Sequence, residues 1–231
     1  SAALMIQRFF DKTGRLKRLD RPDAVEDTAA FWVGISLCAS FIISVIITIL
    51  TISSGSEITV PDFGGVVEQI LSLVHAVVWE ELVTRLLYIG VPMAVISLIV
   101  TKKWGSLRSI LGGFGMSTTA VILIIISSTI FGLAHYPGWE DQAWKVVSAA
   151  LMGVFLGYVF VRFGLYASIM LHFVNNFLTS FNWMGLEPVL VVLELLFLAA
   201  GIVALVYIVK RMLDLGGSGK PLPLFQNSYS K

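Results

Sequence analysis

The feature that most constrains this chain is a series of long apolar runs, most of them about 18 to 25 residues in length. A helix of about 20 residues crosses roughly 30 Å of hydrocarbon at 1.5 Å per residue. The runs cover residues 31–52, 66–100, 117–136, 143–161, 165–183 and 189–209. We therefore predict an all-α, polytopic integral membrane protein with about six transmembrane helices.

Composition and charge exclude several other classes of protein. Only 13% of the residues are charged and 57% are apolar, whereas a soluble domain carries roughly 25% charged residues. The net charge is +1 and no basic stripe is present, so nucleic acid is not an expected partner. The single cysteine, Cys38, excludes an intramolecular disulfide and a cysteine-based metal cage.

The pattern of polar segments predicts three parts. Residues 1–29 form a cytoplasmic segment of mixed charge, residues 30–210 form the transmembrane domain, and residues 211–231 form a flexible cytoplasmic tail. Lys and Arg gather in alternate connections, which places both termini in the cytoplasm by the positive-inside rule, with Lys145 as the exception. The second run contains Gly90 and Pro92 and is either a helix that projects beyond the bilayer or a span followed by an interfacial helix.

Three charged residues lie within the second apolar run. Each charge at membrane depth costs roughly 2.5–3.5 kcal/mol on insertion scales. Glu81 and Arg85 are four residues apart and can pair on a helix, whereas Glu80 lies about 100° around the helix from Glu81. The three residues therefore form either a buried ion cluster that holds helices together or part of a functional site.

Two histidines follow at helical spacing. His135 lies four residues after Phe131, and His172 lies four residues before Asn176, so each pair shares one face of its helix. Alone, each histidine fits an interhelical hydrogen bond. Together with Glu80 they provide one carboxylate and two imidazoles that antiparallel packing can bring to a shared intramembrane cavity.

Such a cluster suits peptide hydrolysis. A carboxylate can activate water, and imidazole or amide groups can stabilise the oxyanion. Glu80, His135 and His172 could also hold a divalent metal such as Zn²⁺ with one position open for water. Motifs of serine hydrolases and of ordinary zincins are absent from the sequence.

In this order the three patterns resemble the motifs of the CAAX protease and bacteriocin-processing (CPBP, Rce1-like) family of intramembrane endopeptidases, formerly grouped as abortive-infection proteins. The motifs Glu-Glu-x-x-x-Arg, Phe-x-x-x-His and His-x-x-x-Asn occur here at Glu80–Arg85, Phe131–His135 and His172–Asn176. The resemblance covers about residues 70–180. Family members often have Phe before the Arg and Gly after it, where this chain has Thr84 and Leu86, so the subfamily stays open.

The resemblance implies a catalytic role for each motif residue. Glu80 would activate water with His135 and His172 as partners, Asn176 would polarise the carbonyl or hold His172, and Glu81 and Arg85 would support them. The implied substrate is a peptide or protein in the lipid bilayer, with a prenylated C-terminal tail or a leader peptide as candidates. The implied location is the plasma membrane in a prokaryote or the endoplasmic reticulum in a eukaryote.

Two other functions use the same residues. A proton-coupled transporter also places Glu and His within the membrane, although no paired broken helices support it. An immunity or scaffold relative would keep the fold without proteolysis. A transporter would show transport without cleavage, and an immunity or scaffold relative would tolerate substitution of Glu80.

Overall fold

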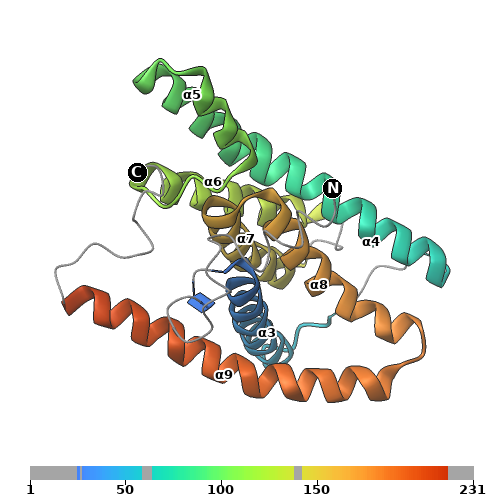
Figure 1. The fold of residues 1–231 in the computed structure, drawn as a ribbon. Coiled ribbons are helices and arrows are strands. Elements are labelled where there is room, and N and C mark those ends of the chain that lie inside the picture. Colours follow the sequence, from blue (N-terminus) through green and yellow to red (C-terminus); the bar gives the residue numbers. More distant parts are fainter. Residues whose placement is uncertain (1–24, 27, 59–63, 138–141, 218–231) are drawn as a thin grey trace.

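The computed structural model describes residues 25–26, 28–58, 64–137 and 142–217, and this part of the chain contains helices and no strand (Figure 1). The main elements are α3 (Ala29–Ser53), α4 (Val66–Glu81), the π-helical η2 (Leu82–Gly90), α5 (Val91–Thr101), the 3₁₀-helical η3 (Trp104–Leu111), α6 (Thr118–Ala134), α7 (Ala143–Phe163), α8 (Leu165–Trp183) and α9 (Glu187–Gly217). The predicted all-α fold is confirmed.

Four helical segments are long and apolar enough to cross a membrane: Ala29–Ser53, Val66–Thr101, Ala143–Phe163 and Glu187–Lys210. The apolar helices Thr118–Ala134 and Leu165–Leu178 are shorter. Each of these six segments coincides with one of the predicted apolar runs. The polytopic membrane class is therefore confirmed, while the number of complete crossings is not fixed by helix length alone.

Local signals in the sequence explain where several helices begin and end. The side chain of Thr28 accepts a hydrogen bond from the Phe31 amide at the start of α3, and Ser117 does the same for Ala120 at the start of α6. Helix α7 ends before Gly164, whose φ of 104° is strained for any residue with a Cβ. The short turn at Gly164 returns the chain directly into α8.

The second apolar run forms one continuous helical segment of 36 residues. At 1.5 Å per residue, about 54 Å is expected for an α-helix of this length, which exceeds the hydrocarbon thickness. In Figure 1 it forms an oblique rod from α4 to α5. The segment is one continuous helix, and its projection beyond the bilayer stays a prediction. The segment η3 folds back and packs against α5.

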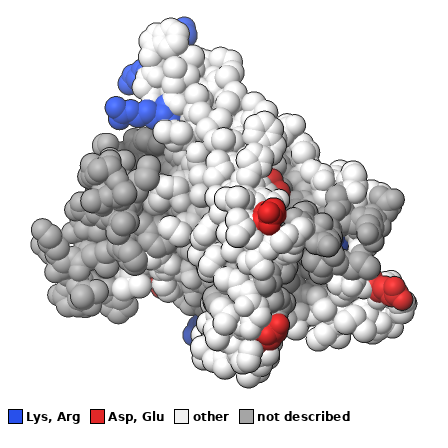
Figure 2. Space-filling view, turned by 90° about the vertical axis from the view of Figure 1, so that its right-hand side faces the viewer, with Lys and Arg blue, Asp and Glu red and all other residues white. Residues whose placement is uncertain are grey.

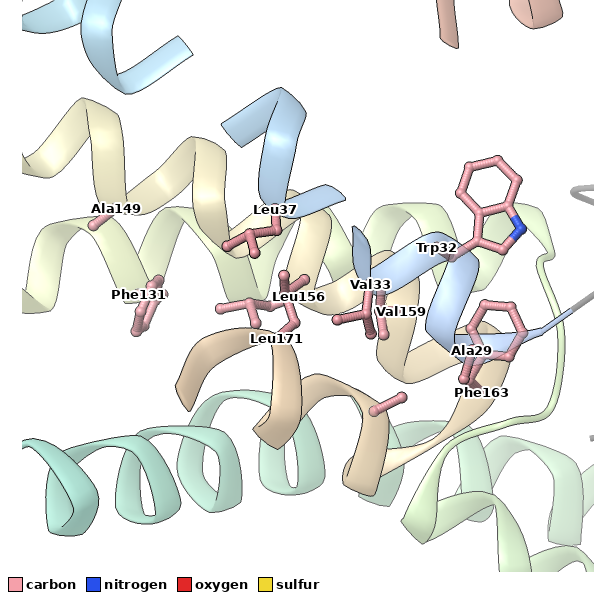
Figure 3. Packing of buried hydrophobic residues seen from close by; sticks show 11 residues of the cluster. Ala29, Trp32, Val33, Leu37, Phe131, Ala149, Leu156, Val159, Phe163 and Leu171 are labelled. Atoms are coloured by element: carbon pink, nitrogen blue, oxygen red, sulfur yellow. The ribbon is translucent and has the colours of Figure 1, made fainter. Parts of the chain in front are cut away.

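The helices lie in layers around α7 and α8 (Figure 1). Helix α9 packs on α3, and α3 packs in turn on α7 and α8. On the opposite side, α4 packs on α8, and η2 packs on α6. The core between α3, α6, α7 and α8 is filled by residues such as Leu37, Phe131, Leu156 and Leu171 (Figure 3).

Helices α6 and α7 approach each other closely through glycines. A Cβ placed on Gly153 would lie 3.0 Å from Ser128, and one on Gly157 would lie 3.0 Å from Ile124. Gly153 and Gly157, four residues apart on α7, therefore allow α7 to pack closely against α6. This close contact places the C-terminal end of α6, with Phe131, against α7.

Charged residues are sparse on the face of the molecule in Figure 2. Lys and Arg gather at its top, where α5 ends in Figure 1, and acidic residues form separate spots. The residues that carry the basic charge at this end include Lys102, Lys103 and Arg108, all of them exposed. The remaining exposed surface of α5 is apolar, as a lipid-facing helix requires.

The predicted terminal segments lie mostly outside the described residues. Of the segment 1–29, only residues 25–26 and 28–29 are described. Helix α9 continues past the predicted end of the transmembrane domain at residue 210 to Gly217, and residues 218–231 are not described. The cytoplasmic location of the two termini stays a prediction.

Gly90 tests the close contact between the rod and η3. A Cβ at Gly90 would overlap the carbonyl oxygen of Ile110, so Gly90→Ala is expected to destabilise the protein by about 1–3 kcal/mol through overpacking. The measurement is the midpoint of thermal unfolding in detergent micelles. Gly34→Ala is the matched control, because a Cβ at Gly34 meets nothing within 4 Å. Equal midpoints for the two variants would contradict the contact.

Candidate active site

The predicted site residues come from α4, η2, α6 and α8. Glu80 and Glu81 end α4, Arg85 lies in η2, His135 follows α6, and His172 lies in α8. Because α8 packs on α4 and α6 packs on η2, segments distant in sequence bring these side chains to one region of the bundle.

Glu81 and Arg85 form a completely buried ion pair. Both side chains are 0% exposed, and Arg85 Nε lies 3.5 Å from Glu81 Oε2. Arg85 also donates to Ser127 Oγ at 3.1 Å, and its guanidinium lies 4.9 Å from the centroid of the Phe131 ring. The i, i+4 pairing expected from the sequence is present, and α6 supplies its further partners.

His172 lies between the two glutamates. Its Nδ1 is 2.9 Å from Glu81 Oε1, and its Nε2 is 3.5 Å from Glu80 Oε2. Ser168, one turn earlier in α8, donates to the other oxygen of the Glu81 carboxylate. Glu81 therefore receives hydrogen bonds on both oxygens and holds the imidazole of His172 in one orientation.

The two adjacent glutamates have different environments. The Glu80 side chain is 28% exposed, whereas that of Glu81 is 0% exposed and that of His172 is 4% exposed. A reacting carboxylate must be reachable by water and substrate. Of this pair, Glu80 meets that requirement, and Glu81 is a buried supporting group.

Both histidines present Nε2 as an acceptor when they are neutral. An ionised carboxylate only accepts hydrogen bonds, so His172 must donate from Nδ1 to Glu81. His135 Nδ1 lies 2.7 Å from the carbonyl oxygen of Phe131, to which it can only donate. Neutral imidazoles in these tautomers are therefore bases at Nε2 and become donors there only after protonation.

Phe131 separates and positions the two imidazoles. Its ring centroid is 4.7 Å from that of His135 and 5.7 Å from that of His172, both in edge-to-face geometry. The described contacts link His172, rather than His135, directly to Glu80. His135 is connected to His172 through the ring of Phe131.

Asn176 lies one turn beyond His172, and both side chains are on one face of α8, as the spacing predicts. Asn176 is half-buried, and its Oδ1 accepts a hydrogen bond of 3.2 Å from Asn175. Its amide nitrogen carries the N–H donors that an oxyanion would need.

The change from α-helical to π-helical backbone occurs directly after Glu81. A π-helix bonds i to i+5, so carbonyl oxygens near such a junction need other donors. Thr84 Oγ1 donates to the Glu80 carbonyl, and Ser127 Oγ donates to the Thr84 carbonyl, each at 2.5 Å. These hydroxyls stabilise the irregular backbone that carries Glu80 and Arg85.

Sequence analysis missed Ser127 and Ser168 as members of this network. Both could have been found by extending the helical spacing backwards, because Ser127, Phe131 and His135 are successively four apart. Ser168, His172 and Asn176 follow the same spacing. Serine is common at ordinary contacts between membrane helices, so its presence at this spacing did not mark a functional site.

The predicted metal site can be compared with these contacts. Metal-binding histidines commonly donate their second N–H to a carboxylate or a backbone carbonyl, as His172 and His135 do here. However, among the described residues no group of three His, Cys, Asp or Glu side chains is arranged to hold a metal ion. The donor chemistry therefore suits a metal, whereas the described residues do not bring three ligands together.

Comparison with known protein families gives one match. The family model for type II CAAX prenyl endopeptidase Rce1-like proteins matches residues 62–178, which is just over half of the chain. The chain belongs to this family. All three Rce1-like motifs, from Glu80 to Asn176, lie within the matched range, so at the family level the chain is a CAAX-protease-type membrane endopeptidase. No curated protein and no solved structure matches the chain.

The contribution of the buried Glu81–Arg85 ion pair to stability can be tested by mutation. Arg85→Met is expected to lower the free energy of unfolding by about 3–5 kcal/mol, because it leaves the Glu81 charge buried without its cation. The double variant Arg85→Met, Glu81→Gln should recover part of this loss, since the charge is also removed. Denaturant titration in detergent micelles measures both. A double variant less stable than Arg85→Met would contradict the pairing.

Proposed function

We propose that the protein is an intramembrane endopeptidase in which Glu80 activates water to hydrolyse a peptide bond near the membrane surface. The observation that carries this proposal is the position of His172, whose Nδ1 is bound to buried Glu81 while its Nε2 faces the partly exposed Glu80. The family assignment supports the same reaction class.

In the first step, Glu80 accepts a proton from water as the water oxygen attacks the peptide carbonyl carbon. Neutral His172 accepts a second hydrogen bond from that water through Nε2, which directs the water's lone pair towards the carbonyl. Glu81 contributes by holding the Nδ1–H tautomer of His172, which is a positioning role.

The attack produces an oxyanion that must be stabilised. The side-chain amide of Asn176 donates to it in this proposal, because the neutral histidines present acceptors rather than donors. Protonated Glu80 then returns its proton to the nitrogen of the leaving amine. The peptide bond is broken, water has been added across it, and the enzyme regains its starting protonation state.

Substitution of the central residues tests the proposal. Glu80→Gln, His135→Ala and His172→Ala are each expected to lower kcat by about 10²–10⁴-fold, as expected for loss of a general base or its partner. The assay is cleavage of a fluorogenic peptide with a prenylated cysteine three residues before its C-terminus, using purified protein in liposomes. Asn176→Ala should be milder because the base remains.

Glu194→Gln is the matched control, since Glu194 is an exposed acid in α9. Its cleavage rate should equal that of the wild type. Full activity in all three central variants would contradict the mechanism. Absence of cleavage by the wild type would instead favour a non-proteolytic role, for which transport or binding would be measured. A leader peptide is assayed as a second substrate. Cleavage of this peptide alone would show that the protein is active and that the prenylated peptide is not its substrate.

Metal dependence is a separate prediction. If Glu80, His135 and His172 bind Zn²⁺ as predicted, a chelator abolishes cleavage, and one divalent ion restores it. Elemental analysis should then find metal in the wild type and less in His172→Ala, a measurement independent of activity. Cleavage that is indifferent to chelation, with no bound metal, would contradict the metal prediction and leave the glutamate mechanism in place.

A further inference from the structure

Three basic side chains gather where α5 ends and η3 begins, in residues 102–108, which we call the basic turn. Lys102, Lys103 and Arg108 are all exposed, and none of them has an acidic partner among the described residues. The sequence contains no Asp or Glu between Glu81 and Glu140. Figure 2 shows the Lys and Arg of this end away from the acidic spots. The basic turn therefore carries positive charge that the described part of the chain does not compensate.

The backbone of the basic turn presents a lysine where a glycine would be easier to accommodate. Lys102 follows the last residue of α5 with φ 55° and ψ 24°, the left-handed conformation in which helices commonly end on glycine. The hydroxyls of Thr101 and Ser106 lie 2.7 Å apart, and the Lys103 amide donates to Thr101 Oγ1 at 3.3 Å. Strain that is kept at a charged residue indicates a use for its side chain.

The basic turn is anchored to the helix bundle. The segment η3 packs against α5 and η2. Directly after η3, the Gly113 amide donates to the Phe160 carbonyl at 2.9 Å. The Gly115 amide donates to the Val161 carbonyl at 3.0 Å. These bonds join the connection to the C-terminal end of α7, so the three cations are presented on a fixed backbone.

The residues next to the basic turn are apolar and exposed. Trp104 is 77% exposed, and Val100 in the last turn of α5 is 75% exposed. From residue 82 to residue 100, each exposed residue of the helical segment is apolar. Exposed apolar side chains belong in hydrocarbon, whereas Trp is enriched in the headgroup layer. Contact with lipid therefore continues along α5 up to the basic turn.

The length of the helical segment agrees with this location. Its 36 residues correspond to about 54 Å as an α-helix, and a bilayer with both headgroup layers is about 40–45 Å thick. A tilt of about 35–40° fits the segment between the two headgroup layers, within the range known for transmembrane helices. The basic turn then lies in a headgroup layer rather than in the water beyond it.

We propose that the basic turn binds the headgroup of an anionic phospholipid. The phosphate is bound by Lys102, Lys103 and Arg108, of which Arg108 offers two parallel N–H donors. The acyl chains follow the apolar residues of α5, beginning with Val100. This end of the protein is predicted to be cytoplasmic, and cytoplasmic leaflets carry anionic lipids. The proposal is independent of the proposed peptidase reaction.

A lipid fits the basic turn better than an anion dissolved in water. A soluble phosphate or an acidic protein would satisfy the cations and leave Trp104 and Val100 exposed to water beside them. A phospholipid supplies the anion and the apolar chains together.

The test uses Trp104 as a local reporter in reconstituted vesicles. The phosphatidylcholine membrane contains a brominated lipid, which quenches Trp fluorescence and is either phosphatidylglycerol or phosphatidylcholine. The signal of Trp104 is the difference between each protein and its Trp104→Phe counterpart. The wild type should prefer phosphatidylglycerol by about 10- to 100-fold, because each basic residue near an anionic surface contributes about fivefold in affinity. Added salt should weaken this preference.

Substitutions separate a defined site from general surface charge. Lys102→Gly and Lys103→Gln should each lower the preference by about fivefold, and adding Arg108→Gln to both should abolish it. Glycine suits the left-handed backbone at residue 102, so a loss there does not come from a distorted turn. Lys210→Gln is the matched control, because Lys210 is an exposed lysine in α9, and it should keep the wild-type preference. An equal loss in this control would overturn the site.

The position of the bromine and a soluble competitor distinguish the other occupants. Lipid brominated near the headgroup should quench Trp104 more strongly than lipid brominated near the chain ends. No quenching by either lipid would place the basic turn in water, support the projecting helix and overturn the proposal. Equal quenching by the anionic and the neutral lipid would also overturn it. Glycerol phosphate should leave the quenching unchanged, and displacement of the lipid would reassign the site to a soluble phosphate.

Discussion

The buried ion pair between Glu81 and Arg85 is the interaction on which the rest of the structure depends. Two opposite charges that are 0% exposed would be strongly destabilising if either were alone. Ser127 from α6 accepts a hydrogen bond from Arg85, and Ser168 and His172 from α8 hydrogen-bond to the Glu81 carboxylate. The pair therefore joins three helices by specific geometry, which apolar contacts in a membrane supply less precisely because lipid tails are equally apolar.

This network also gives two adjacent glutamates different roles. Glu81 is buried, pairs with Arg85 and orients His172. Glu80, whose side chain is 28% exposed, is the carboxylate that water can reach. The ring of Phe131 lies against Arg85, His135 and His172 at once. A change in the supporting pair would consequently move the reacting groups even though neither Glu81 nor Arg85 contacts the peptide in the proposed mechanism.

Much of the fold follows from patterns that the sequence contains. Six apolar runs became six apolar helices because a helix satisfies its own backbone hydrogen bonds in lipid. Spacing of four residues was sufficient to place Glu81 with Arg85 and His172 with Asn176 on shared helix faces. The π-helical junction at Leu82–Gly90 was not predicted, since no local residue pattern specifies a change from i+4 to i+5 bonding.

The sequence by itself determined the membrane class, the helix positions, and the family to which the motifs belong, because these depend on composition and short-range periodicity. Tertiary structure alone decided which carboxylate contacts which imidazole. Among the described contacts, it is His172 that approaches Glu80 directly, and Ser127 and Ser168 join the network from other helices. Such pairings depend on the rotation and depth of each packed helix, and these are set by contacts between residues far apart in the chain.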